Sequence, residues 1–312
     1  MRILVTGGCG FIGSNLVQKL DELGYSVTSV DNMSSSRDDA ENFMKTLPRV
    51  EFLQCCLADD IVLNKIKAKE YSVVFHVAAI PRVSFSVENP SLTTDANINK
   101  SVKLLESCIG NIDRLVFSSS SSVYGGADIM PTPANHPKDP KSPYAWQKSS
   151  LEDLIKIFCQ TYEGFDAISL RYFNVFGPGQ FGGSAYSTAI SAWCHAVKNE
   201  TPLRKDGTGE QSRDLCYIDN VVSANIQAMK NPGSFSGECF NIACGDRISN
   251  NEILDFFEHQ FENLEILQAP FRPGDVMHTH ADISETVDVL QYEPAVRFWD
   301  GLKRTLAWWG LA

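Results

Sequence analysis

The sequence lacks any apolar run long enough to cross a lipid bilayer, and its basic residues are outnumbered by its acidic ones. Its 312 residues include 27 lysines and arginines against 38 aspartates and glutamates, which gives a formal net charge of −11. No block of basic residues stands out, so a surface that follows the phosphates of a nucleic acid is not expected. The apolar start of the chain, residues 3–5, is too short for a signal peptide. We therefore expect a cytoplasmic protein with neither a membrane nor a nucleic acid as partner.

Patterns typical of metal-binding and disulfide-rich proteins are also missing. The nine cysteines are scattered without a Cys-x-x-Cys spacing, which argues against a zinc knuckle and against the disulfide framework of a secreted protein. His278 and His280 lie two residues apart, but no third ligand is near them in the sequence, so no metal site is expected. The hydrophobic content of 43% and the charged content of 21% are those of an ordinary globular protein.

What the chain does contain is a glycine-rich loop between a short strand and a helix. A strand is predicted at residues 3–5 and a helix at residues 14–23, and between them Gly7, Gly10 and Gly13 are spaced three apart. The backbone N–H groups of such a loop, and the N-terminus of the helix behind it, can approach a pyrophosphate that side chains would obstruct. The segment therefore predicts binding of a dinucleotide.

The second predicted strand, residues 26–30, ends in an acidic residue. Asp31 follows the glycine loop by about twenty residues, the spacing at which a carboxylate accepts hydrogen bonds from the adenosine ribose hydroxyls. A carboxylate at that point also repels a 2′-phosphate, so NAD is favoured over NADP. Arg37 is close enough in the sequence to weaken this preference, and a solvated turn is the alternative interpretation of Asp31.

Strands and helices alternate along the first 177 residues. Such alternation predicts an α/β fold with a parallel, doubly wound sheet of the Rossmann type. We expect residues 1–177, with returning segments at about 214–245, to form an NAD-binding domain, and residues 178–312 to form mainly a smaller C-terminal α/β lobe for the substrate. Further strands are predicted at residues 50–54, 72–78, 114–120 and 166–174, and further helices at residues 61–69, 91–107 and 144–162.

A tyrosine and a lysine in the helix predicted at residues 144–162 are candidates for acid–base chemistry. Tyr144 and Lys148 are four residues apart, so a helix places the phenol and the ammonium on the same face, one turn from each other. A cation beside a tyrosine favours its phenolate, so a group whose ordinary pKa is about 10 can act as a base near neutrality. An exposed lysine near a half-buried tyrosine is the structural alternative.

Polar and small residues end the neighbouring strands. Five consecutive serines, residues 118–122, close the strand predicted at 114–120, and Ala78 and Ala79 close the strand before it. Residues at the carboxyl ends of parallel strands face the ligand crevice, so these side chains are expected beside the cofactor. A serine-rich turn without such a role is the alternative.

Taken in order, these motifs resemble those of the extended short-chain dehydrogenase/reductases. Within that family the sequence is similar to NAD-dependent nucleotide-sugar epimerases of the UDP-glucose 4-epimerase type, which hold NAD in a Rossmann domain and a nucleotide sugar in a small C-terminal domain. The resemblance extends over nearly the whole chain. It rests on Thr6-Gly7-Gly8-Cys9-Gly10-Phe11-Ile12-Gly13, Asp31-Asn32, Ser118-Ser119-Ser120 before Val123-Tyr124-Gly125, Ser142-Pro143-Tyr144 with Lys148, Leu170-Arg171-Tyr172-Phe173-Asn174 and Arg272-Pro273-Gly274-Asp275.

The resemblance implies a role for each matching residue. Tyr144 would be the catalytic base, Lys148 would bind the nicotinamide ribose and lower the pKa of that tyrosine, and Ser120 would hydrogen-bond the reacting hydroxyl. The residues implied in NAD binding, besides Tyr144 and Lys148, are Gly7, Gly10, Phe11, Ile12, Gly13, Asp31, Asn32, Leu57, Ala78, Ala79, Asn97 and Phe173. Those implied in substrate binding are Ser120, Asn174, Arg213, Arg272, Asp275 and Thr279. A homodimer that pairs through helices near residues 91–107 and 144–162 is also implied.

Two positions leave alternatives open. Arginines that converge from separate segments suit a diphosphate in an acidic protein, but Arg213 could instead form a surface ion pair with Asp214. Relatives usually carry an acidic residue near the adenine, after the third strand, where this sequence has Cys56 with Asp59 three residues later. A thiol does not accept a hydrogen bond as a carboxylate does, so we expect weaker cofactor affinity or a substitute role for Asp59.

The reaction implied by the resemblance is the reversible 4-epimerisation of a UDP-hexose. Tyr144 would take the proton of the sugar 4-hydroxyl as hydride passes to NAD, and the transient 4-keto sugar would turn over before NADH returns the hydride to its other face. Dehydratases and decarboxylases of the same superfamily typically carry an acidic residue one or two positions after the serine. Here those positions are Ser121 and Ser122, so epimerisation is favoured.

The choice of sugar is inferred from one further position. In these epimerases the residue four positions after the aspartate of the Arg-x-Gly-Asp segment limits the sugar 2-substituent, and here that residue is the small Thr279. We therefore expect UDP-GlcNAc and UDP-GalNAc as the substrate pair, with UDP-glucose or UDP-glucuronate 4-epimerisation as alternatives. A dehydratase or decarboxylase of the same fold, or a non-catalytic NAD-binding module, are the remaining alternatives.

Overall fold

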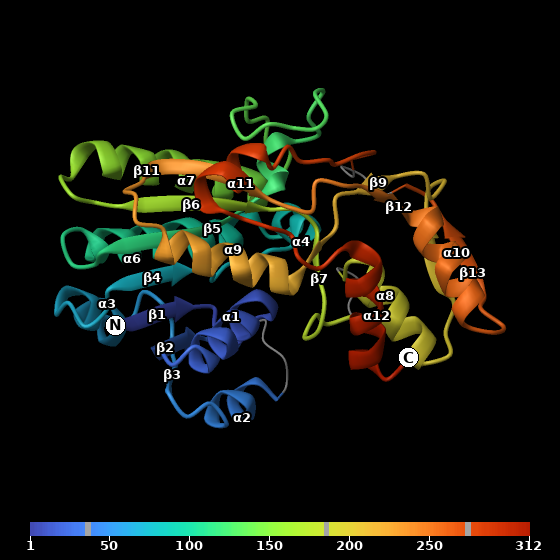
Figure 1. The fold of residues 1–312 in the computed structure, drawn as a ribbon, viewed down its shortest axis with the longest axis horizontal. Helices are drawn as coiled ribbons and strands as arrows, with labels where there is room; N and C mark the ends of the chain where they lie inside the picture. Colours follow the sequence, from blue (N-terminus) through green and yellow to red (C-terminus); the bar gives the residue numbers. More distant parts are fainter. Residues whose placement is uncertain (35–38, 184–186, 272–275) are drawn as a thin grey trace.

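Seven parallel strands form the central sheet of the protein, as seen in a computed structural model that describes residues 1–34, 39–183, 187–271 and 276–312 (Figure 1). Every strand pair in this sheet is parallel. The strand order is β11-β6-β5-β4-β1-β2-β3, so the chain winds outward from β1 in both directions. The strands are β1 (Arg2–Thr6), β2 (Ser26–Asp31), β3 (Val50–Gln54), β4 (Val73–His76), β5 (Arg114–Ser120), β6 (Ala167–Tyr172) and β11 (Ser236–Ile242).

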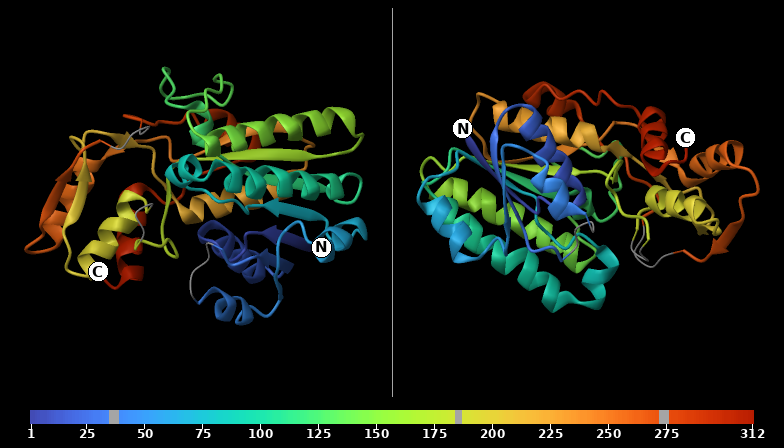
Figure 2. Two further views of the ribbon diagram at one scale, coloured as in Figure 1. Left: turned by 180° about the vertical axis from the view of Figure 1, so that it is seen from behind. Right: turned by 90° about the horizontal axis from the view of Figure 1, so that it is seen from below.

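Apolar residues on both faces of the strands explain why helices cover the sheet on both sides. Successive side chains of β1 alternate, so that Ile3 and Val5 join one buried cluster and Leu4 joins another. The first cluster includes apolar residues of α1 (Phe11–Glu22) and α9 (Ile218–Lys230). The second includes apolar residues of α3 (Asp60–Lys67), α6 (Lys100–Cys108) and α7 (Pro143–Thr161). Figure 2 shows the sheet between these two layers, which confirms the predicted doubly wound α/β fold.

Short helices connect the main elements of the sheet domain. They are α2 (Ala40–Lys45), α4 (Val83–Glu88) and α5 (Pro90–Thr94), and a 3-10 turn at Ser121–Tyr124 follows β5. The single helix expected at residues 91–107 is instead divided into α5, a π-helical turn at Asp95–Asn99, and α6. Apolar periodicity did not reveal this division, because a π turn inserts one residue without interrupting the helical pattern.

A second group of elements lies beyond the carboxyl ends of the strands, on the right of Figure 1, and contains the C-terminus. A two-stranded parallel ladder of β8 (Leu203–Asp206) and β13 (Ile266–Ala269) packs there with helices. Its helices are α8 (Ala189–Lys198), α10 (Asn250–Gln260) and α12 (Phe298–Trp309), and its short strands are β9 (Ser212–Arg213) and β12 (Ile248–Ser249). The remaining pair, β7 (Val175–Phe176) and β10 (Cys216–Tyr217), and the helix α11 (Ser284–Leu290) connect this group to the sheet.

Nothing in the described part of the chain indicates a membrane span or a metal site. No helix among those residues is both long and apolar enough to cross a bilayer. The same residues contain no group of three or more histidine, cysteine, aspartate or glutamate side chains that could hold a metal ion.

A buried ion pair fixes α9 against the sheet. The Nε and Nη2 atoms of Arg114 on β5 donate to the two carboxylate oxygens of Asp166, at 2.9 Å each. Its Nη1 atom donates to the carbonyl oxygens of Ala228 and Asn231 at the end of α9, at 2.7 and 2.8 Å. One guanidinium thus joins two strands and a helix.

We expect Arg114→Met to lower the free energy of unfolding by about 3 kcal/mol, because it leaves Asp166 buried without its partner. The matched control is Arg304→Met, since Arg304 lies 3.6 Å from Asp219 with both side chains 57% exposed. An exposed pair of this kind contributes less than about 1 kcal/mol. Urea denaturation of both variants measures their free energies of unfolding. Equal losses of this free energy in the two variants would contradict the expectation.

Candidate active site

The glycine loop is shaped by close contacts that exclude side chains. Gly7 has a φ of +70°, and a Cβ placed on it would lie 2.7 Å from the Cα atom of Ala78 at the end of β4. A Cβ on Gly13 would collide with the carbonyl oxygen of Gly7. Gly10 differs, because a Cβ on it would meet no atom closer than 3.4 Å. The packing of the protein therefore requires Gly7 and Gly13, whereas Gly10 leaves open space over the N-terminus of α1.

That open space suits an anion. Gly10 is the N-cap of α1, no side chain caps the helix, and its first turn contains no acidic residue. The first N–H groups of a helix have no partner within it, and the helix dipole favours negative charge there. Asp31 holds the loop in place, because its carboxylate accepts hydrogen bonds from the backbone N–H of Cys9 at 2.9 Å and of Met33 at 2.8 Å. Phe11 and Ile12 are half-buried in this first turn, and Asn32 is exposed beside Asp31. These residues fit the pyrophosphate and ribose of a dinucleotide.

Asn97 lies in the π-helical turn and is 2% exposed. Its Oδ1 atom accepts from the backbone N–H of Ile80 at 2.8 Å, and its Nδ2 atom donates to the Ile80 carbonyl at 3.2 Å and to Oε1 of Gln147 at 2.8 Å. The side chain is therefore used to hold the segment that contains Ala78 and Ala79 against α7. The structure places Asn97 beside the crevice as a brace.

At the end of β3, the residues on the expected adenine side are brought together. The Asp59 carboxylate accepts a hydrogen bond from the backbone N–H of Cys56 at 2.9 Å, and Leu57 between them is 8% exposed. The carboxylate of Asp59 is thus directed back to the turn at Cys56. This contact gives Asp59 a structural role at the site where the sequence lacks the usual acidic residue.

One face of α7 lies along the end of β5. The Lys148 ammonium donates to the carbonyl oxygen of Ser118 at 2.6 Å, and Ser120 lies close enough to the Tyr144 phenol to lower its pKa. Both Tyr144 and Lys148 are buried, at 7% and 3% exposure, so the alternative of an exposed lysine is wrong. The helix begins at Pro143 with Ser142 as N-cap, whose side chain accepts from the N–H of Ala145.

Burial dominates the ionisation of this pair. It raises the pKa of Tyr144 to about 12, against the smaller opposing effect of the hydrogen bond from Ser120. It lowers the pKa of Lys148 to about 7, against the opposing effect of the Glu152 carboxylate. The Lys148 Nζ atom lies 6.0 Å from the centre of the Tyr144 ring. The lowered pKa of Tyr144 expected from the sequence is not seen in the protein without a ligand, because desolvation of the phenol outweighs the effect of Ser120.

Two charged residues to which the sequence patterns assign no role, Glu152 and Arg171, lie next to this pair. Glu152 lies one turn beyond Lys148 on α7 and is 2% exposed, and Arg171 on β6 forms a buried ion pair with it at 2.7 Å. Tyr144, Lys148 and Glu152 follow one another at intervals of four residues, and residues at that spacing share a helix face. This spacing could have identified Glu152 as a neighbour of the pair.

Residues implied in substrate binding gather where the second group of elements meets the sheet. The Nδ2 atom of Asn174, whose φ is +31°, donates to the Asp214 carbonyl at 3.0 Å and to the Thr279 hydroxyl at 2.9 Å. Arg213 lies on the adjacent strand β9, and its Nη1 atom donates to the carbonyl of Met277 at 3.1 Å. Hydrogen bonds thus connect Asn174 and Arg213 to the segment that contains Met277 and Thr279. Arg272 and Asp275, like Arg37, lie outside the described residues.

Asp214 is buried and not a surface residue. It is 0% exposed, and its carboxylate accepts from the backbone N–H groups of Cys244 at 2.9 Å and Ala281 at 3.1 Å. Burial raises its pKa to about 6, which these hydrogen bonds oppose. Phe173, one residue before Asn174, is also buried and lies 6.1 Å from the ring of Tyr124. Asp214 therefore ties together the segments that carry the implied substrate contacts.

A nucleotide cradle and a buried hydroxyl–phenol–ammonium group, both at the carboxyl edge of one parallel sheet, define an enzyme of the dinucleotide-dependent class. The chain matches the model of the NAD dependent epimerase/dehydratase family over residues 3–243. A UDP-glucose 4-epimerase structure from Thermotoga maritima is 33% identical, covers 99% of each chain and has a TM-score of 0.92. The chain therefore belongs to the NAD-dependent epimerase/dehydratase family.

Other relatives of the chain are named for different sugar substrates. A UDP-N-acetylglucosamine 4-epimerase structure from Methanobrevibacter ruminantium is 34% identical, with a TM-score of 0.90, over 98% of this chain and 97% of that one. A UDP-glucuronate 4-epimerase from Thermodesulfobacterium geofontis is 32% identical over 98% of this chain and 95% of its own length. The predicted family, the NAD cofactor and the isomerase class are confirmed by these matches.

The crowding at Gly13 gives a test of the cofactor cradle. We expect Gly13→Ala to weaken NAD binding at least about tenfold, because the added methyl group displaces the Gly7 carbonyl and opens the loop. Isothermal titration with NAD measures this loss. The matched control is Gly24→Ala just after the other end of α1, where φ is +86° but no atom lies within 4 Å of a Cβ. That variant is expected to lose about 1 kcal/mol of stability and to keep its NAD affinity.

Proposed function

We propose that this protein catalyses the reversible 4-epimerisation of a UDP-hexose, with UDP-GlcNAc and UDP-GalNAc as its preferred pair. The observation that carries the proposal is the gathering of three groups at the carboxyl end of β5: Ser120 beside the phenol of Tyr144, whose pKa it lowers, and Lys148 one turn further along α7. This group lies at the edge of the sheet that also holds the glycine loop. The epimerase relatives of known structure support the same reaction type.

In this proposal the residues of the sheet domain, 1–177 with returning segments at about 214–245, hold NAD. The glycine loop and the start of α1 bind its pyrophosphate, Asp31 binds the adenosine ribose, and the segments around Leu57, Ala78, Asn97 and Phe173 line the rest. NAD supplies a hydride acceptor that can also return the hydride. The chain's own contribution is to orient the sugar and to move one proton.

Tyr144 takes that proton from the sugar hydroxyl, and Ser120 orients the same hydroxyl by a hydrogen bond. A tyrosine pKa of about 12 is too high for a base near neutrality, so the pKa must fall when the site is complete. The buried ammonium of Lys148 is a cation placed to lower it. We assign Lys148 to the nicotinamide ribose as well, since its three N–H donors exceed the single Ser118 contact.

The absence of a carboxylate after Ser120 favours epimerisation over elimination or decarboxylation. Ser121 and Ser122 occupy the two following positions, in the 3-10 turn after β5. The nearby carboxylate of Glu152 is engaged by Ser119 and Arg171, so it is not available to a substrate. A dehydratase or decarboxylase would release a product of changed composition, and a non-catalytic NAD-binding module would turn over no sugar.

Thr279 supports an N-acetylated sugar. Its side chain is small and its hydroxyl is directed to Asn174 and to the backbone N–H of Asp214, at 2.9 and 3.2 Å, so it adds little bulk to the sugar side. Residues 178–312 form mainly the sugar-nucleotide lobe in this proposal, with Asn174, Arg213 and Arg272 on the diphosphate and Asp275 on the uridine ribose. UDP-glucose and UDP-glucuronate are the alternative substrates.

The decisive experiment is incubation of the protein and NAD with UDP-GlcNAc, UDP-glucose and UDP-glucuronate in separate reactions. Proton NMR of the sugar H4 couplings reports whether an equatorial hydroxyl has become axial, and absorbance at the nicotinamide band reports any net release of NADH. We expect the 4-epimer of UDP-GlcNAc with no accumulation of NADH. Net NADH formation, a stable keto sugar, or no turnover of all three substrates would reject the proposal.

Tyr144→Phe tests the assignment of the base. Loss of the phenolic oxygen should lower kcat by about a thousandfold, the range of a positioned proton acceptor. NAD binding by titration should be retained, because the ring remains packed. A folded, NAD-binding variant with ordinary turnover would reject Tyr144 as the base.

Thr279→Tyr tests the choice of sugar. A tyrosine at this position should lower kcat/KM for UDP-GlcNAc by about a hundredfold, while turnover of UDP-glucose is retained, because the larger ring takes the space of the acetyl group. Thr279→Ser is the control that keeps the hydroxyl and the small size. Full activity of the tyrosine variant on UDP-GlcNAc would contradict the assignment.

We also propose a homodimer through the helices that cover the α7 side of the sheet. Leu92 on α5, and Trp146 and Ile157 on α7, are 52%, 49% and 52% exposed. Light scattering is expected to show a dimer that Trp146→Asp converts to a monomer. Trp308→Asp on α12 is the matched control, since Trp308 is 47% exposed and lies far from these helices in the chain. A monomeric wild type, or a dimer unaffected by Trp146→Asp, would contradict this interface.

A further inference from the structure

The carboxyl end of β5 and one face of α7 meet through three pairs of contacts. Ser120 lies beside the Tyr144 phenol and lowers its pKa, Ser118 accepts through its carbonyl from Lys148, and the Ser119 hydroxyl donates to Oε1 of Glu152 at 2.5 Å. Three consecutive serines thus meet three helix residues spaced one turn apart. The first two pairs belong to the proposed mechanism, and the third does not.

Glu152 is held by a guanidinium on its other side. The Nε atom of Arg171 donates to Oε1 at 2.8 Å and its Nη2 atom donates to Oε2 at 2.7 Å, a two-point contact that fixes the plane of the carboxylate. Both side chains are almost fully buried, at 2% and 5% exposure. A buried carboxylate without such a partner would be strongly disfavoured, so the ion pair with Arg171 accounts for the place of Glu152 inside the protein.

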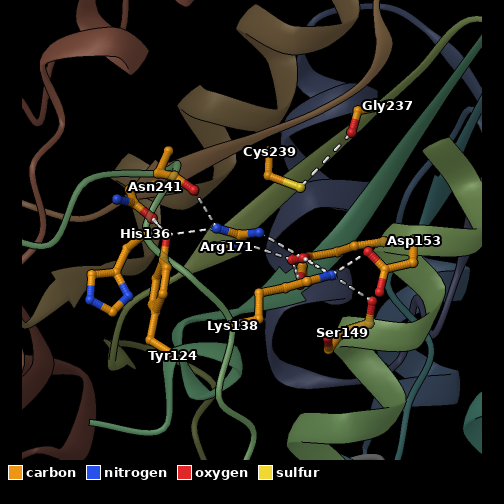
Figure 3. A network of polar contacts seen from close by, with 12 residues as sticks. Tyr124, His136, Lys138, Ser149, Asp153, Arg171, Gly237, Cys239 and Asn241 are labelled. Carbon is orange, nitrogen blue, oxygen red and sulfur yellow. Dashed lines mark hydrogen bonds and ion pairs between the residues drawn. The ribbon is translucent and has the colours of Figure 1, made fainter. Parts of the chain in front are cut away.

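Arg171 is itself anchored from several parts of the chain (Figure 3). Its Nη1 atom donates to the Tyr124 hydroxyl at 2.8 Å and to the Ala134 carbonyl at 2.7 Å. The Tyr124 hydroxyl donates to Oδ1 of Asn241 on β11 at 2.6 Å. The network therefore reaches from β11 across β6 to α7, and it leaves Glu152 little freedom to move.

The charges around Lys148 come from few groups. On α7 they are Tyr144 and Glu152, and on β4 there is His76, whose pKa burial lowers to about 3, so that it is neutral. β5 contributes the Phe117 ring, 4.7 Å from the ammonium, and the Ser118 carbonyl, both uncharged. Arg171, Cys239 and Lys138 lie on the other side of Glu152. The Lys138 Nζ atom is 3.5 Å from the Glu152 carboxylate and 2.5 Å from the carboxylate of the exposed Asp153.

We propose that Glu152 is a positioning residue of the catalytic site, which fixes the end of β5 through Ser119 and supplies the negative charge that Lys148 faces. The inference rests on the proposed function, because it assigns to Glu152 the task of keeping Lys148 charged for Tyr144. Burial alone would favour the neutral amine, and the pKa of Lys148 stays at about 7 because the carboxylate opposes that effect.

The test compares Glu152→Gln with Asp153→Asn. The first change keeps an oxygen that can accept from Ser119 and removes the charge; the second removes a charge from the next residue, which is 62% exposed and contacts only the Lys138 side of the network. A 13C NMR titration of the Lys148 Cε resonance in the protein without cofactor is the first measurement. We expect its midpoint to fall by about one pH unit in Glu152→Gln and to be unchanged in Asp153→Asn.

The second measurement is the pH profile of kcat/KM with the sugar substrate. Because charged Lys148 is needed, activity falls as pH rises through its pKa, and this alkaline limb should move to lower pH by the same amount in Glu152→Gln. Ser119→Ala should lower kcat several-fold without moving the limb, since it loosens the strand end and keeps the charge. An unchanged kcat in Ser119→Ala would reject the anchoring role.

The outcomes separate this inference from the proposed function. A Glu152→Gln variant that has lost only thermal stability, with the Lys148 midpoint unmoved, would overturn the positioning role and leave Tyr144 untouched. If that variant does not fold, Glu152→Gln/Arg171→Gln removes both buried charges and is expected to show the same lowered midpoint. A folded double variant with the original midpoint, or failure of both to fold, would assign the pair to the fold alone. Ordinary turnover of Tyr144→Phe would instead reject the proposed function.

Discussion

The contact between α7 and the end of β5 is the interaction on which the chemistry depends. It buries a phenol, an ammonium and a carboxylate against three successive serines, and the two charged groups each have a hydrogen-bond partner there. Polar groups in such a place are costly unless every one is paired, which explains why the network continues through Arg171 to Tyr124 and Asn241. The low-dielectric surroundings that make these pairs necessary also move the pKa values of Tyr144 and Lys148 away from their ordinary range.

The cofactor cradle follows from a different constraint, which is space. Gly7 and Gly13 are needed because the loop, the end of β4 and the start of α1 pass too close to one another for a side chain. Gly10 has no such neighbour, so the packing of the protein does not require a glycine there. The space that a side chain would fill is instead left for a ligand. Asp31 connects this loop to the adjacent strand through the N–H of Cys9, and its position at the end of β2 suits the ribose. The arrangement is the cofactor cradle that we propose for this member of the NAD-dependent epimerase/dehydratase family.

The substrate side depends on segments that are far apart in the chain. Asn174 follows β6, Asp214 follows β9, and Thr279 belongs to the return from the C-terminal elements, yet their backbone and side-chain groups share hydrogen bonds. The buried Asp214 carboxylate adds the ends of β11 and the segment at Ala281 to the same junction. Because these contacts join the two groups of elements, the substrate site that we propose there needs residues from both.

The sequence by itself determined the parallel sheet, the glycine loop with Asp31, and the helix that carries Tyr144 and Lys148. Each of these is a local pattern, fixed by alternation, by glycine spacing or by an offset of four residues. Other features depended on tertiary structure. The π-helical turn that contains Asn97 and the pairing of Glu152 with Arg171 require partners distant in sequence. The sequence predicted that residues at about 214–245 return to the sheet domain, but only the structure decided that residues 236–242 pair with β6 as the seventh strand. The pKa values also depend on tertiary structure. Burial raises the pKa of Tyr144, and the phenol becomes buried only when the sheet and α7 have packed together.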